Sequence, residues 1–152
     1  MSEKEFHTFR EYMKHDGSLT AAMEDYLEMI CRLAQSKGFT RINTLAAALN
    51  VQPPSATKMV QKLAEMKLVD YEKYGILTLS HEGQKLGQKL LERHNMIEDF
   101  LRLLGITKCV LEETEKIEHT INTNTLKSLT KFVRFLKSRP DIISDFEKFE
   151  TD

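Results

Sequence analysis

The stretch that most constrains this chain is residues 43–64, where two short helical patterns follow each other closely. Asn43 is of a type that caps helices, and the first pattern runs from Thr44 to Leu49. A tight turn is expected over 50–52, and Pro53 then stands where the first turn of a helix accepts proline. Two helices joined by a turn of about four residues predict a helix-turn-helix.

The second of these helices has an apolar side and a polar side. Its apolar positions recur at helical spacing and are Ala56, Met59, Val60 and Leu63. The opposite side carries small polar and basic side chains, which suit phosphates and base edges. We therefore expect contacts to DNA from Ser55, Thr57, Lys58, Gln61 and Lys62.

An alternating pattern rich in β-branched and aromatic residues follows over 68–80. Gly75 supplies a turn between the two halves of this pattern, which predicts a β-hairpin. A hairpin directly after the second helix makes the unit a winged helix-turn-helix. Lys73 and Tyr74 would then lie on the wing, close to the DNA backbone. The alternative is a helical hairpin followed by unrelated strands.

Helical periodicity dominates the rest of the chain. One helix is expected to begin after Thr20 as its N-cap and to end at Gly38. A long helix starts at Ser80 or His81 and runs to Leu104, with an apolar stripe wider than one partner helix requires. Shorter helices are expected over 3–15, from 107 or 108, after Asn122 and over 142–149. Together these patterns predict a mainly α fold with a small β-hairpin wing.

The short stretch 115–119 crowds charge on one helical face. Glu115, Glu118 and His119 stand at i, i+3 and i+4, so two carboxylates and an imidazole lie within about one turn. Like charges this close disfavour a helix, and a divalent cation would compensate them. Asp25 and Glu28 form a second acidic pair at i and i+3. The alternative interpretation of both sets is a solvated acidic face with a chance histidine.

Composition limits the class of protein and its surroundings. Apolar residues make up 41% and charged residues 30% of the sequence, which is typical of a globular chain. The net charge is −1, so any DNA-binding surface must be locally basic or must gain charge from something added. Cys31 and Cys109 lie far apart, and no leader or membrane-spanning apolar run is visible. We expect a soluble cytoplasmic protein.

Several motifs occur in order along the chain. They are Met23-Glu24-Asp25-Tyr26-Leu27-Glu28, Ser55-Ala56-Thr57-Lys58-Met59-Val60-Gln61-Lys62-Leu63, Tyr71-Glu72-Lys73-Tyr74, Arg93-His94, Phe100-Leu101-Arg102 and Glu115-Lys116-Ile117-Glu118-His119. In this order the chain resembles the manganese transport regulators, a branch of the diphtheria toxin repressor family of metal-dependent transcriptional repressors. The resemblance covers residues 20–137.

The resemblance implies a homodimer that binds double-stranded operator DNA and no membrane. The implied organisation is an N-terminal extension over 1–19, a winged helix-turn-helix DNA-binding domain over 20–80, and a helical dimerisation and metal-binding domain over 81–152. The helix over 81–104 would link the two domains.

The resemblance also implies two Mn(II) ions per subunit. Carried over position by position, the ligands are Asp25, Glu28, His94, Glu115, Glu118 and His119. The iron-responsive branch resembles this set but has a methionine at the position of Asp25 and a cysteine at that of Glu115. The harder donors here therefore favour manganese. Binding would order the dimer for its operator and repress manganese uptake genes.

Some features depart from the resemblance or leave alternatives open. Pro54 stands where the branch often has a serine, and the wing tip Gly75-Ile76 lacks an expected Arg-Gly pair. An enzyme is not expected, because the chain has no pair of Glu-x-x-His motifs, nucleophile elbow, P-loop or dinucleotide fingerprint. The remaining alternative is a winged-helix regulator that responds to iron, to zinc or to a non-metal signal.

Overall fold

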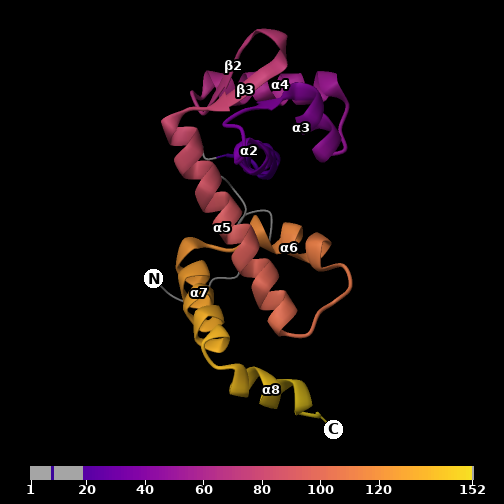
Figure 1. The fold of residues 1–152 in the computed structure, drawn as a ribbon, viewed down its shortest axis with the longest axis vertical. Coiled ribbons are helices and arrows are strands. Elements are labelled where there is room, and N and C mark those ends of the chain that lie inside the picture. The colour runs from indigo at the N-terminus through magenta and orange to yellow at the C-terminus, as the bar shows by residue number, and fades with distance from the viewer. Residues whose placement is uncertain (1–7, 9–18, 152) are drawn as a thin grey trace.

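The structure is a computed structural model that describes Thr8 and residues 19–151, so the helix predicted over 3–15 lies outside the described residues. In chain order the described elements are α2 (Ala21–Ala34), β1 (Thr40–Arg41), α3 (Ile42–Ala48), α4 (Pro53–Glu65), β2 (Val69–Tyr71), the 3-10 turn η1 (Lys73–Gly75), β3 (Ile76–Leu79), α5 (His81–Leu103), α6 (Val110–Glu118), α7 (Thr123–Lys137) and α8 (Pro140–Lys148). The strands β2 and β3 lie at one end of an elongated molecule and α8 lies at the other, with α5 running between the two halves (Figure 1). The prediction of a mainly α fold with a small β wing is confirmed.

The winged helix-turn-helix forms one end of the molecule. Helices α2, α3 and α4 pack around a core that includes Leu27, Leu45, Val60 and Leu77, all fully buried. Strands β2 and β3 pair antiparallel as the predicted hairpin, with Asp70 opposite Thr78. Burial of this apolar set stabilises the end as a unit with its own core.

The sequence did not predict the third strand, β1, and misplaced the start of α3. Thr40 pairs with Leu77 on the free edge of β3, so the sheet order is β1-β3-β2. The backbone stays extended through Arg41, and α3 begins at Ile42. The predicted N-cap Asn43 was therefore wrong, because strand pairing fixes where the chain can turn into the helix.

Helix α5 joins the two ends of the molecule (Figure 1). Its predicted start at Ser80 or His81 is confirmed, because the helix begins at His81 with Ser80 as its N-cap. Ser80 Oγ accepts from the Gly83 backbone N–H at 3.0 Å and donates to the Lys67 carbonyl at 2.7 Å. Further along, Gly87 lies against α2, where a Cβ would come within 2.9 Å of the Cys31 Cβ. Small residues at these contacts let one helix pack closely on both the wing and α2.

The far end has its own small core, formed by Ile97, Leu101 and Val110 of α5 and α6. Helix α6 begins at Val110, two or three residues later than the predicted start at 107 or 108, because Cys109 adopts a left-handed backbone with φ 56°. Helix α8 begins earlier than predicted, with Pro140 in its first turn. Among the described residues no helix combines the length and apolar character needed to span a bilayer.

Candidate metal centre

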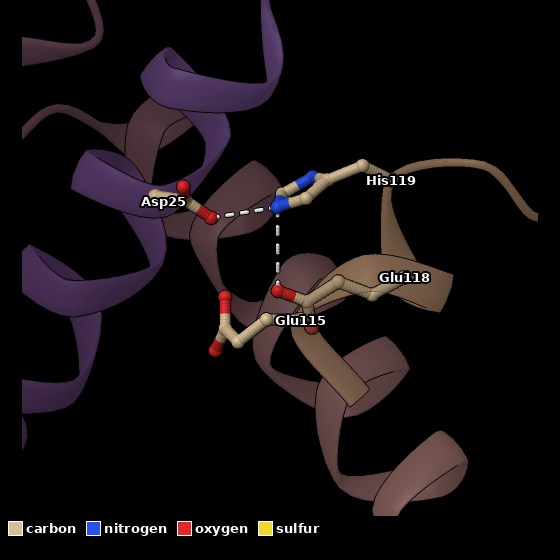
Figure 2. Close-up of side chains that lie close together, drawn as sticks. All are labelled: Asp25, Glu115, Glu118 and His119. Atoms are coloured by element: carbon tan, nitrogen blue, oxygen red, sulfur yellow. Dashed lines mark hydrogen bonds and ion pairs between the residues drawn. The ribbon is translucent and has the colours of Figure 1, made fainter. Parts of the chain in front are cut away.

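The predicted ligands come from three elements that meet where the two ends of the molecule join. Asp25 and Glu28 lie on α2, His94 on α5, and Glu115 and Glu118 on α6, with His119 capping the C-terminus of α6. Figure 2 shows Asp25 facing the α6 side chains across the gap between the helices. The structure thus brings together all the predicted ligand residues, although they span most of the chain.

The first group consists of Asp25, Glu115, Glu118 and His119, whose ligand atoms lie within 4.8 Å of one another. His119 Nε2 is 2.7 Å from Asp25 Oδ1 and 3.5 Å from Glu118 Oε1. This imidazole therefore presents one nitrogen to carboxylates from two different helices (Figure 2).

The second group consists of Glu28, His94, Glu115 and Glu118, with ligand atoms again within 4.8 Å. His94 Nδ1 lies 2.9 Å from Glu118 Oε2, 3.5 Å from Glu115 Oε1 and 3.8 Å from Glu28 Oε2. Glu115 and Glu118 belong to both groups. The arrangement therefore suits two neighbouring cations bridged by shared carboxylates.

Burial and mutual repulsion perturb the acidic side chains. Burial, followed by the nearby charge of Glu118, raises the pKa of Glu28 to about 7. The same two causes raise the pKa of Glu115 to about 7. These shifts show that the site disfavours its own ionised carboxylates in the absence of a compensating cation.

The two imidazoles are perturbed in the opposite direction. A hydrogen bond to Glu118 raises the pKa of His94, although burial opposes this. Hydrogen bonds to Asp25 and then to Glu24 raise the pKa of His119 to about 10. The carboxylates thus favour the protonated form of both rings, and at His119 a proton occupies a place that suits a metal ion.

The residues present fit a divalent cation. Glu118 is only 1% exposed, and its Oε1 accepts no hydrogen bond within the described part of the chain. The donors are carboxylate oxygens and imidazole nitrogens without a sulfur ligand, a set suited to Mn(II) and similar ions. A buried, unsatisfied carboxylate oxygen facing other carboxylates is the strongest structural sign of such a site.

Sequence reasoning missed the residues that surround the ligands. Glu24 and Arg93 contact His119, Glu98 lies 3.5 Å from His94, and Arg32 contacts Glu28. Glu24 and Arg93 appear in the quoted motifs, but no spacing rule links residues so far apart. The other two contacts, Arg32 with Glu28 and Glu98 with His94, each have i, i+4 spacing on one helix, so a local signal was available for them.

The expected DNA contacts lie on α4 and on the turn of the wing. Thr57 is half-buried, and the others are exposed: Ser55, Lys58, Gln61, Lys62, Lys73 and Tyr74. Tyr74 is 88% exposed and has a positive φ of 66°. Arg41 Nη1 donates to the Tyr74 carbonyl at 3.2 Å, which ties the wing tip to β1.

Comparison with known families accounts for both ends of the molecule. Residues 18–77 match the model described as "Iron dependent repressor, N-terminal DNA binding domain". Residues 80–147 match "Iron dependent repressor, metal binding and dimerisation domain". The chain belongs to the iron-dependent repressor family. The family predicted from the motifs is confirmed, and this member is a metal-dependent transcriptional repressor and not an enzyme.

Relatives of this repressor cover most of its length. It is 40% identical over 133 residues to the "HTH-type transcriptional regulator MntR" of Lysinibacillus sphaericus, covering 87% of this chain and 96% of the relative. It is 38% identical over 130 residues to the protein of the same name in Oceanobacillus iheyensis, covering 85% and 88%.

Solved structures of other repressors share the fold. The "manganese regulator SloR" matches with a TM-score of 0.66 and 32% identity, over 77% of this chain and 55% of that one. A "manganese-dependent transcriptional repressor complex with manganese" matches with a TM-score of 0.67 and 28% identity, over 74% and 53%. The chain therefore spans about half the length of these solved structures.

Proposed function

We propose that this repressor responds to manganese, binding two Mn(II) ions per subunit and acting on operator DNA as a homodimer. The observation that carries the proposal is the pair of ligand groups sharing Glu115 and Glu118. Asp25, Glu115, Glu118 and His119 would hold the first ion. Glu28 and His94 would hold the second, together with the two shared carboxylates.

The donor types support manganese as the metal. The iron-responsive branch resembles this site but carries sulfur at two positions, where this chain has Asp25 and Glu115. Carboxylates prefer harder ions than thioether or thiolate sulfur does. The similarity to relatives named MntR, and to the solved structure of the manganese regulator SloR, also supports manganese as the metal. Replacing Asp25 with Met should therefore loosen selectivity for Mn(II).

The regulatory effect would follow from which helices carry the ligands. Asp25 and Glu28 belong to the DNA-binding end, whereas Glu115, Glu118 and His119 belong to the far end. The carboxylates repel one another across this junction, and bound divalent ions would supply the compensating positive charge. Counting the ligand carboxylates as ionised and the histidines as neutral, two ions would also move the formal net charge from −1 to about +3, which favours approach to DNA. Bound ions would restrict the motion of the DNA-binding end relative to the far end of each subunit. This would raise the fraction of dimers whose two recognition helices fit DNA half-sites about 34 Å apart.

We assign DNA binding to residues 20–80 and metal binding and dimerisation to 81–152, after an extension over 1–19. Ser55, Thr57, Lys58, Gln61 and Lys62 would face the major groove, and Lys73 and Tyr74 the backbone beside it. A repressor acting on the chromosome would work in the cytoplasm.

The homodimer contact is proposed at an apolar groove formed by α5, α7 and α8. Its lining includes Phe100, Leu104, Phe135, Leu136, Ile143 and Phe146. Phe135 and Phe146 are each about half exposed. The groove lies within the residues that match a dimerisation domain, and a second copy of the chain is the occupant we assign to it.

Fluorescence anisotropy with duplexes selected from a random pool in Mn(II) tests the proposal. We expect affinity to be about 10- to 100-fold higher with Mn(II) than with a chelator, the usual scale of coupling between sites. Lys58→Ala should lose DNA affinity while it retains Mn(II) binding by calorimetry. Equal DNA affinity in Mn(II) and in chelator would contradict the proposal.

A further inference from the structure

Glu24 lies beside a proposed ligand but faces a different atom of the site. Asp25 Oδ1 is 2.7 Å from His119 Nε2, whereas Glu24 Oε1 is 3.3 Å from the other ring nitrogen, Nδ1. The two carboxylates of α2 thus hold the imidazole from opposite sides. Glu24 is in neither ligand group, so the proposed function gives it no role.

Arg93 holds Glu24 in place. Its Nη1 donates to Glu24 Oε2 at 3.1 Å, and the two side chains are only 14% and 16% exposed. Arg93 Nη2 also lies 3.4 Å from His119 Nδ1. Glu24 comes from α2, Arg93 from α5 and His119 from the end of α6, so this cluster joins the same three elements as the ligand groups.

The protonation of the His119 ring decides which hydrogen-bond partner its Nδ1 atom requires. A neutral imidazole that gives its Nε2 lone pair to a metal carries its proton on Nδ1, and that proton requires an acceptor. Of the two neighbours of Nδ1, a carboxylate can accept and a guanidinium can only donate. Glu24 therefore favours the tautomer with a free Nε2. Arg93 alone would favour the reverse tautomer, with Nε2–H directed at Asp25.

We propose that Glu24, oriented by Arg93, is a positioning residue that fixes His119 in the tautomer and orientation needed to bind the first ion. This inference rests on the proposed metal function and deepens it. With the first ion bound, Glu24, His119 and the metal would form a carboxylate–histidine–metal triad at the junction of α2, α5 and α6, with Arg93 orienting the carboxylate. Because the second group uses His94 instead, the role of Glu24 is confined to the first ion.

Glu24→Gln is the sharpest variant, because Arg93 dictates how the amide must point. The guanidinium requires the amide oxygen, which leaves the amide N–H₂ facing His119 Nδ1. That donor favours the tautomer with Nε2–H, which cannot ligate. We expect about 10- to 100-fold weaker binding of the first ion, the usual effect of losing such a partner, with the second ion affected less than about threefold.

Two readouts separate positioning from a purely structural ion pair. Calorimetry with Mn(II) gives the affinities, and long-range ¹H–¹⁵N NMR of the Cd(II)-loaded chain reports which nitrogen of His119 carries the proton. Wild type should show Nδ1–H with Nε2 bound to metal. Glu113→Gln is the matched control, since it removes the same charge from exposed α6 surface, where Glu113 pairs only loosely with Lys116 at 3.6 Å. It should behave as wild type.

Glu24→Asp tests the same idea by rescue, because it keeps a carboxylate acceptor. It should retain the Nδ1–H signal and recover most of the affinity lost in Glu24→Gln. The inference is overturned if Glu24→Gln binds both ions as wild type does, or if Glu24→Asp is as impaired as Glu24→Gln. A wild-type chain that binds neither Mn(II) nor Cd(II) would instead reject the proposed function itself.

Discussion

Arg32 brings a positive charge to the edge of the second ligand group. Its Nη2 donates to Glu28 Oε2 at 3.4 Å, and the side chain is 40% exposed. The same cavity is lined by His94 and Glu115. Arg32 therefore neutralises a carboxylate that the second ion would use, and it would repel that ion once bound.

Replacing Arg32 with Met should tighten the second Mn(II) site. We expect a gain of about 1 kcal/mol, roughly fivefold in affinity, because a partly exposed charge is screened by solvent. Calorimetric titration with Mn(II) measures the change. Arg32→Lys keeps the charge and should stay close to wild type. An Arg32→Met variant with unchanged affinity would show that the arginine does not compete.

The pKa shifts at the site predict that metal binding releases protons. Below pH 7 Glu28 and Glu115 hold protons, since each pKa is raised to about 7, and His119 stays protonated up to about 10. All three must lose protons to act as ligands, so Mn(II) affinity should fall as the pH drops from 8 to 6. Calorimetry at pH 7 in buffers of different ionisation enthalpy should show release of roughly two protons per chain. A buffer-independent heat would contradict this.

The same shifts fix the pH dependence of the metal-free fold. The raised carboxyl pKa values mean that the native state holds more protons than the unfolded state between about 4.5 and 7, so stability falls as the pH rises through that range. The raised pKa of His119 contributes stability that is complete below 6.5 and is lost as the pH approaches 10. Mn(II) binding should offset both losses, because it removes the need for these protons.

Among the helices, α5 depends on close backbone contact at its first turn. A Cβ on Gly83 would lie 1.9 Å from the Leu68 carbonyl oxygen, an atom of the backbone that precedes β2. Alanine is otherwise about 1 kcal/mol better than glycine inside a helix. The contact outweighs this preference, because backbone on both sides must move to relieve it.

Gly83→Ala should therefore destabilise the chain by about 3 kcal/mol, the upper range for overpacked sites. Urea unfolding followed by circular dichroism measures the loss. The neighbouring Gln84 is exposed, and Gln84→Ala should change stability by less than about 0.5 kcal/mol. A Gly83→Ala variant as stable as wild type would mean that α5 can shift away from the wing without cost.

At the scale of the whole molecule, two separate cores are joined by one continuous helix and by the ligand groups. Every proposed ligand comes from a single chain, so metal binding within a subunit does not require the dimer. Residues of α5, α7 and α8 line the apolar groove. Helices α7 and α8 lie toward the end of the molecule opposite the wing (Figure 1). Dimerisation and metal binding can therefore be tested independently.

Phe146→Glu should convert the dimer to a monomer while leaving Mn(II) binding intact. The substitution places a charge in the apolar groove, whose burial would cost several kcal/mol. Analytical ultracentrifugation reports the oligomeric state, and calorimetry reports the metal. Phe149→Glu is the matched control, because Phe149 is 72% exposed and does not line the groove. A Phe146→Glu chain that remains dimeric would place the interface elsewhere.

The sequence by itself determined the features that depend on neighbours within one turn. The N-caps Thr20 and Asn122 each accept from a backbone N–H three residues on, as predicted. Helix α5 begins at His81, one of its two predicted starts. The helix-turn-helix and the hairpin likewise followed from periodicity and turn residues. Asn43 failed as a cap because a distant strand, β3, decided where the extended chain ended.

Only the tertiary structure decided how distant residues combine. Asp25 and His119 are far apart in sequence, and their 2.7 Å contact depends on how α2 crosses α5 and meets α6. Packing of small residues such as Gly87 against Cys31 sets that crossing, and no local pattern encodes it. The same geometry places Glu115 and Glu118 in both ligand groups. It also brings Glu24 and Arg93 into contact with His119. The sequence supplied the donor types, and helix packing determined which atoms face each other.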